Sequence, residues 1–107
     1  ESGGSPVDVN YETGHDLAQS TSFQDLSREV GNGNDESVSG TLQLFNPAST
    51  TFVKHFISRT NCYYYGDFTL ETYAAGYCNT TTAIDGVQFK MSSGNIDAGD
   101  ICLYGIN

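Results

Sequence analysis

Apolar and polar side chains alternate over several short segments of the chain, which is typical of strands buried on one face. The alternation is clearest over residues 87–91, where the apolar and polar sets are Val87, Phe89 and Met91 against Gln88 and Lys90. Residues 92–100 are rich in Gly, Asp, Ser and Asn, which favour turns. Ile101, Leu103 and Tyr104 then indicate a closing strand. The pattern predicts a C-terminal hairpin that anchors the fold.

Three further strands are expected in the middle of the chain. Residues 37–45 alternate until Pro47, which cannot continue a hydrogen-bonded ladder. Residues 51–58 carry apolar groups on both faces, which indicates a central strand. Residues 68–78 form a strand interrupted at Gly76, where we expect a bulge or a close backbone approach.

The N-terminal part is less regular. Residues 1–20 mix Gly, Ser, Asp and Asn with few apolar positions, which predicts an irregular arm that a partner would order. Residues 22–30 fit either a strand or a short helical turn, and the strand is favoured. About six strands separated by turns are typical of a two-sheet sandwich, so we expect an arm over residues 1–20 and a β-sandwich domain over residues 21–107.

Composition supports the all-β class. The chain has 107 residues, of which 37% are hydrophobic, so one domain with a thin core is expected. Thirteen acidic residues against four basic ones give a net charge of -9, which repels nucleic acid and anionic membranes. The chain opens at Glu1 without a methionine, so we expect that the start was cleaved or unseen, or that the sequence is a piece of something longer.

No residue pattern in the sequence indicates catalysis, a metal site or a cofactor. The sequence lacks the common nucleophile, zinc-protease and phosphate-loop motifs, and His55 is interpreted as a core or interface histidine. The acidic and amide residues around positions 32–36 and 95–100 lack the spacing of a calcium loop. Cys62, Cys78 and Cys102 are expected to be reduced and packed as small hydrophobes, although a bridge from Cys62 to Cys78 remains an alternative.

The best candidate site is a tyrosine-rich loop expected over residues 60–67. Its candidate contact residues are Tyr63, Tyr64, Tyr65 and Asp67. Three adjacent large rings cannot all face one core, because side chains alternate across a strand. Subunit packing is the favoured role, with contact to a sugar or receptor and ordinary packing within the fold as alternatives.

A resemblance to a viral family adds to this picture. It is carried by Ser39-Gly40-Thr41-Leu42-Gln43-Leu44-Phe45-Asn46-Pro47, by residues 49–56, by Ala75-Gly76-Tyr77 and by residues 82–106. These stretches, within residues 20–107, resemble the jelly-roll modules of tailed-bacteriophage virion proteins of the fibre, tail-tip and capsid-decoration types.

The resemblance implies a jelly-roll-like antiparallel β-sandwich that is a structural virion protein and not an enzyme. Its partners would be copies of itself and other virion proteins, and it would be assembled into the virion in the host cytoplasm. A receptor- or glycan-binding module that contacts a host surface glycan through the tyrosine loop is the alternative. The family has no catalytic residues to carry over.

Overall fold

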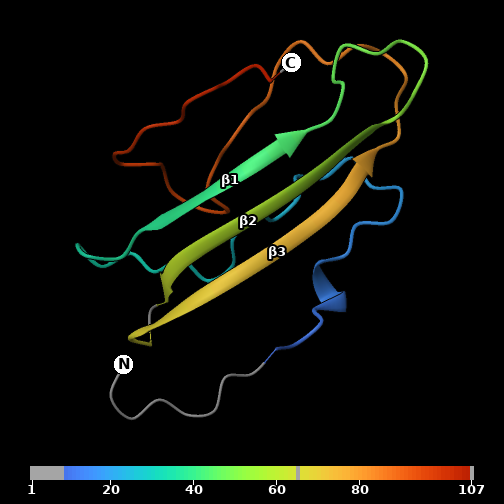
Figure 1. The fold of residues 1–107 in the computed structure, drawn as a ribbon. Coiled ribbons are helices and arrows are strands. Elements are labelled where there is room, and N and C mark those ends of the chain that lie inside the picture. The colour runs from blue at the N-terminus through green and yellow to red at the C-terminus, as the bar shows by residue number, and fades with distance from the viewer. Residues whose placement is uncertain (1–8, 65, 107) are drawn as a thin grey trace.

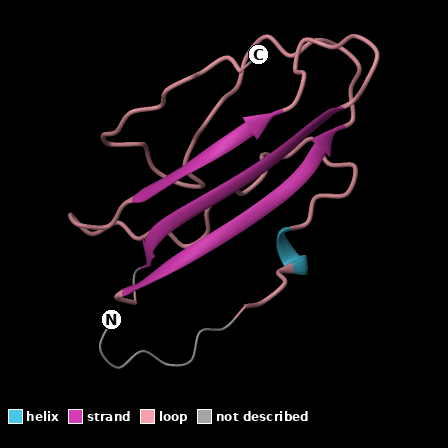
Figure 2. Ribbon diagram, in the orientation of Figure 1, coloured by secondary structure: helices cyan, strands magenta, loops and turns pink. Residues whose placement is uncertain are grey.

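The computed structural model describes residues 9–64 and 66–106 and contains one three-stranded antiparallel sheet (Figure 1). The strands are β1 (Val38–Leu44), β2 (Lys54–Tyr64) and β3 (Phe68–Cys78), in the order β1-β2-β3. One turn of 3-10 helix, η1 (Thr13–His15), precedes them, and Figure 2 shows the other described residues as loops. The all-β class expected from composition is therefore confirmed.

The middle of the chain follows the sequence pattern closely. β1 and β3 begin and end within two residues of the expected segments, and β2 is central, as its two apolar faces predicted. At Gly76 the register with Phe56 is continuous, so there is no bulge. A side chain rather than another backbone approaches this position, because a Cβ on Gly76 would lie 3.0 Å from the Phe56 ring.

The expected loop over residues 60–67 is mostly strand. Residues 60–64 belong to β2, and pairing continues to Tyr64 opposite Phe68. A tight turn follows, in which the Asp67 amide donates to the Tyr64 carbonyl oxygen at 3.0 Å and Asp67 has a φ of 62°. The loop prediction was wrong because aromatic and β-branched residues favour a paired strand wherever a partner strand is available.

The prediction of a C-terminal hairpin was also wrong. Within residues 79–106 the structure has no strand, and Phe89 is 39% exposed rather than a core residue. The alternating segments are short and find no neighbour to pair with, so their backbone is tied at single points such as Ile84 N to Pro47 O at 2.8 Å. The turn chemistry was sound, since Gly94 and Gly99 both have positive φ.

Neither the strand nor the helical turn expected over residues 22–30 is present. This segment is irregular and makes one isolated bridge, from Val30 to Tyr64. The described residues therefore hold one sheet, and a second sheet that would complete a sandwich is not shown. Residues 9–20 are irregular apart from η1, and residues 1–8 of the expected arm lie outside the described residues.

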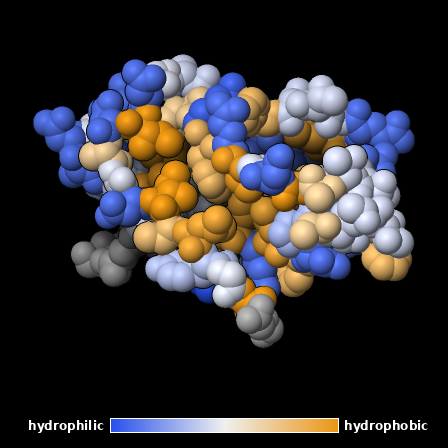
Figure 3. Space-filling model, turned by 90° about the horizontal axis from the view of Figure 1, so that it is seen from above, coloured by the Kyte–Doolittle hydropathy of each residue, from blue (hydrophilic) through white to orange (hydrophobic). Residues whose placement is uncertain are grey.

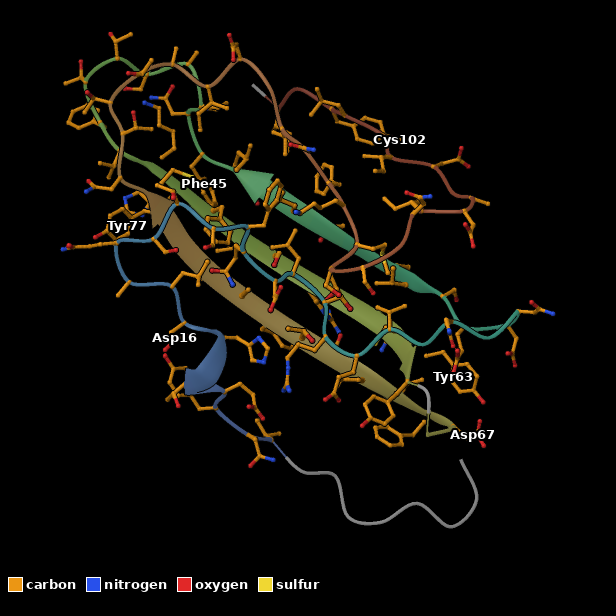
Figure 4. All side chains as sticks on the ribbon, turned by 180° about the vertical axis from the view of Figure 1, so that it is seen from behind. Asp16, Phe45, Tyr63, Asp67, Tyr77 and Cys102 are labelled. Carbon is orange, nitrogen blue, oxygen red and sulfur yellow. The ribbon has the colours of Figure 1, made fainter. Side chains whose placement is uncertain are left out.

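One face of the sheet is covered by the chain itself. Figure 4, seen from behind, shows the segment between η1 and β1 crossing this face. Thr60 Oγ1 donates to the Leu26 carbonyl oxygen at 2.6 Å, and Cys62 Sγ donates to the Arg28 carbonyl oxygen at 3.2 Å. The even-numbered side chains of β2 thus anchor residues 26–30 across the sheet.

The covered core is small and largely polar. Among the described residues Cys62 is the one buried hydrophobic side chain, while Lys54, Ser58 and Thr60 are buried polar ones. Apolar burial is the main favourable contribution to folding, so this core gives the isolated chain little stability.

Candidate functional site

The opposite face of the sheet is open. No described segment crosses the face turned toward the viewer in Figure 1. Strand geometry places alternate side chains on it, and we call this set the open face: Ser39, Thr41, Gln43 and Phe45 of β1 and its end, His55, Ile57, Arg59, Asn61 and Tyr63 of β2, and Thr69, Glu71, Tyr73, Ala75 and Tyr77 of β3. All of them are exposed except Tyr63, which is half-buried.

Aromatic side chains form a row across one end of the open face. The Phe45 amide donates to the His55 carbonyl oxygen, and His55 lies in register with Tyr77. The His55 and Tyr77 rings are 6.0 Å apart and tilted by 49°. Figure 4 shows Phe45 and Tyr77 at the same end of the sheet. His55 is therefore an exposed surface residue, and the alternative that placed it in the core was wrong.

The positively charged side chain of Arg59 lies at the centre of the open face. Arg59 Nε lies 2.5 Å from Glu71 Oε1, and its guanidinium carbon lies 5.3 Å from the centroid of the Tyr73 ring. The hydrogen bond to Glu71, followed by the negative charge of that carboxylate, raises the pKa of Arg59 further. Arg59 is thus held over β3 and remains charged at every ordinary pH.

A shallow hollow lies beside the Arg59 side chain. Its volume is about 260 Å³, and it is lined by residues 39–41 of β1, 59–61 of β2 and Glu71 of β3. Most of the lining side chains carry hydroxyl, amide or charged groups. The open face therefore has exposed rings on β3 and a polar recess over β1 and β2 that reaches Glu71.

The predicted contact residues are only partly brought together. Tyr63 Oη donates to Asp67 Oδ1 at 3.2 Å, and Figure 4 shows both at one end of the sheet. Tyr64 is on the covered face and stacks on Phe68, with 4.2 Å between ring centroids. Tyr65 lies outside the described residues. The tyrosines therefore divide between the two faces, as their alternation along the chain requires.

The pair of Tyr63 and Asp67 gives a testable pKa shift. The hydrogen bond to Asp67, and then its negative charge, raise the pKa of Tyr63 above the ordinary 10.0. Because the neutral phenol is favoured in the folded state, this contribution to stability is complete below pH 10 and is lost as the pH rises through the folded-state pKa. We expect Asp67→Asn, which tolerates the same positive φ, to lower the pKa of Tyr63 in an NMR titration of the tyrosine rings.

A matched control is available in the N-terminal segment. Tyr11 Oη donates to Asp16 Oδ2 at 2.9 Å, and the same two causes raise the pKa of Tyr11. Asp16→Asn should therefore lower the pKa of Tyr11 and leave that of Tyr63 unchanged. An unchanged Tyr63 titration in Asp67→Asn would show that the hydrogen bond does not persist in solution.

The cysteines are free, and the sheet register excludes the bridge between Cys62 and Cys78. Cys62 pairs with Leu70, whereas Cys78 is eight residues further along β3. That separation is about 27 Å, far beyond the roughly 7 Å that a disulfide spans between Cα atoms. Cys62 is buried as expected. Cys78 and Cys102 are exposed, so the prediction that they pack as small hydrophobes was wrong for these two residues.

A second apolar surface lies outside the sheet. Figure 3 shows hydrophobic side chains gathered on the molecule as seen from above, the side on which the C-terminal segment lies in Figure 1. Exposed apolar residues of this segment include Ile96, Ile101, Leu103 and Ile106. The sequence analysis assigned Ile101 and Leu103 to a closing strand and so missed this surface.

Comparison with protein-family models, curated proteins and solved structures finds no match to the chain. In residues 9–64 and 66–106, no group of three His, Cys, Asp or Glu side chains is placed to hold a metal ion. The same residues include no helix long and apolar enough to cross a membrane.

Proposed function

We propose that the chain is a structural virion protein of a tailed phage, a decoration or fibre component that acts by packing against neighbouring subunits. The single observation that supports this proposal is the distribution of apolar side chains. Eighteen large hydrophobic residues are exposed in the described part, against one buried hydrophobic residue. A protein that displays its apolar groups in contiguous areas is built to be covered by another protein.

In this proposal the open face and the irregular N-terminal segment contact neighbouring subunits. The second sheet that would complete a jelly-roll sandwich is supplied by an adjacent subunit. Phe45, Ile57, Tyr73 and Tyr77 would then become core residues of the assembly. The resemblance of residues 20–107 to phage virion modules agrees with such a role. The net charge of -9 keeps unassembled subunits soluble at high local concentration.

The test is the protein content of purified virions of the virus that encodes the chain. We expect quantitative mass spectrometry to find it in many copies per particle. Ile57→Glu, which adds a charge in the open face, should lower incorporation at least about tenfold, because burying an unpaired carboxylate is costly. Phe52→Glu is the matched control, since Phe52 is 69% exposed in the loop between β1 and β2. Virions without the chain would refute the proposal.

A second candidate function is binding to a host receptor or glycan. The observation that favours it is the exposed Asp67 carboxylate, with the Tyr63 phenol beside it at the end of the sheet. Tyrosine rings and carboxylates together suit sugar recognition. In that case Tyr63→Ala would abolish attachment to host cells without changing the number of copies per virion.

A further inference from the structure

The open face is complementary to itself. On β3, Tyr73 and Tyr77 are 68% and 59% exposed, and the small side chain of Ala75 lies between them. On the β1 side the hollow of about 260 Å³ lies in the same cross-strand row as Tyr73, because Thr41, Arg59 and Tyr73 are in register. The exposed tyrosine rings are thus on β3, whereas the hollow lies over β1 and β2 and reaches Glu71 of β3.

A two-fold axis parallel to β2 and above it brings the β3 rings of one copy over the β1 side of the hollow in the other. Such a rotation preserves position along the strands and exchanges the two sides of the sheet, so β3 of one copy lies over β1 of the other. Tyr73 then lies over the hollow at Thr41, and Tyr77 lies over Phe45. Each contact occurs twice, which is the defining property of an isologous interface.

We infer that the open face binds a second copy of this chain, sheet against sheet, about a two-fold axis along β2. The inference rests on the proposed function and names the partner that completes the sandwich. The two sheets would pack about 10 Å apart, as in a β-sandwich.

The position of Arg59 is compatible with this symmetry. Arg59 belongs to the central strand, so its backbone would lie close to the axis. Its guanidinium, however, is held toward β3 by Glu71 and Tyr73. The two guanidinium groups therefore lie on opposite sides of the axis, and each carries its own neutralising carboxylate.

The distribution of acidic residues also favours a second copy of the chain as the partner that covers the open face. Glu71 is the one acidic residue within the three strands, and it is paired with Arg59. The other acidic residues of the described part are in loops, turns and the irregular segments. Two molecules of charge -9 can therefore approach through their open faces without placing unpaired carboxylates in contact.

The size of the face sets the strength of the contact. Two strands of 11 residues span about 36 Å, one of 7 residues spans about 23 Å, and each is about 4.8 Å wide, so one face covers about 450 Å². Two faces would bury about 900 Å², just under the lower limit of about 1,000 Å² for a specific interface. The dimer should consequently form and dissociate with concentration rather than persist.

Sedimentation velocity in reducing buffer, over a range of protein concentrations, tests the inference. We expect a concentration-dependent dimer that strengthens with added salt, since salt screens repulsion between acidic molecules. Tyr73→Ala should weaken association at least about tenfold, as expected for an aromatic residue central to an interface. Tyr104→Ala is the control, because Tyr104 is 80% exposed in the C-terminal segment, and it should have no effect. Circular dichroism verifies that both variants keep the sheet.

Cross-linking tests the geometry separately, in a background where the exposed Cys78 and Cys102 are replaced by serine. Gln43, Ile57 and Ala75 are in register, so the same axis places Ala75 of one copy over Gln43 of the other. A short bismaleimide should therefore join Gln43→Cys to Ala75→Cys when the two variants are mixed, and should join neither to itself; both variants keep Tyr73. A chain that is monomeric at all concentrations, equal effects of Tyr73→Ala and Tyr104→Ala, or loss of association through Leu103→Glu alone would overturn the inference.

The two proposals can fail independently. A monomer that is nevertheless abundant in virions would remove the second copy as the partner and leave the structural role. A dimer formed by a protein that virions lack would support the interface and refute the virion role.

Discussion

Replacement of Lys54 by alanine is expected to lower the free energy of unfolding by about 2 to 4 kcal/mol, because it removes a fully buried side-chain stem and leaves a cavity. Lys54 lies at the start of β2 on the covered face, and its Nζ donates to the Thr80 carbonyl oxygen at 3.2 Å. The side chain thus joins the sheet to the beginning of the C-terminal segment. Urea unfolding at low protein concentration, where association is absent, measures the loss.

The variant Lys54→Met separates the contribution of the aliphatic stem to stability from that of the charged ammonium group. Methionine keeps most of the volume and removes an ammonium group that is costly to bury. We therefore expect Lys54→Met to be within about 1 kcal/mol of the wild type, or more stable. Equal losses in both variants would show that the ammonium and its hydrogen bond, rather than the stem, hold the segment in place.

The second large effect is expected at Gly40 in β1. A Cβ at this position would lie 2.5 Å from the Arg59 carbonyl oxygen and 2.8 Å from Thr60 Cα. Both are backbone atoms of the paired strand, so the clash cannot be relieved by moving a flexible side chain. Gly40→Ala should therefore destabilise the sheet by about 2 to 3 kcal/mol, the usual cost of overpacking.

Gly86→Ala is the matched control for this substitution. A Cβ on Gly86 meets nothing within 4 Å, and its φ is not in the left-handed region. We expect a neutral or slightly stabilising change, because alanine restricts the unfolded chain. Similar thermal midpoints for the two variants would mean that β1 and β2 separate enough in solution to accommodate the methyl group at Gly40.

The sequence predicted the sheet well because its strands pair with immediate neighbours. Residues 37–45 and 68–78 alternate regularly, and each pairs with the segment next to it in the chain, so local patterning was sufficient. Residues 87–91 alternate as regularly but are not a strand in the structure. Alternation reports which side chains could share a face, whereas a strand also needs a partner for its backbone hydrogen bonds.

The candidate site was predictable only in part. Tyr63 and Asp67 are paired near the surface, but the open face that surrounds Arg59 was not identified from the sequence. The available signal was the presence of apolar groups on both faces of residues 51–58, which was interpreted as burial inside a sandwich. Side chains on two faces of a central strand look the same whether both faces are covered within one chain or one is left for a neighbour.

The connectivity of the sheet has a consequence for the rate at which subunits of the proposed assembly would become ready to associate. Every strand pair is a hairpin between consecutive strands, and β2 and β3 are joined by residues 65–67 alone. A β-hairpin closes within microseconds. In the proposed assembly the sheet would therefore form before any neighbour is met and would gain most of its apolar burial only afterwards. Diffusion and encounter between folded subunits, rather than folding itself, would then limit the growth of that assembly.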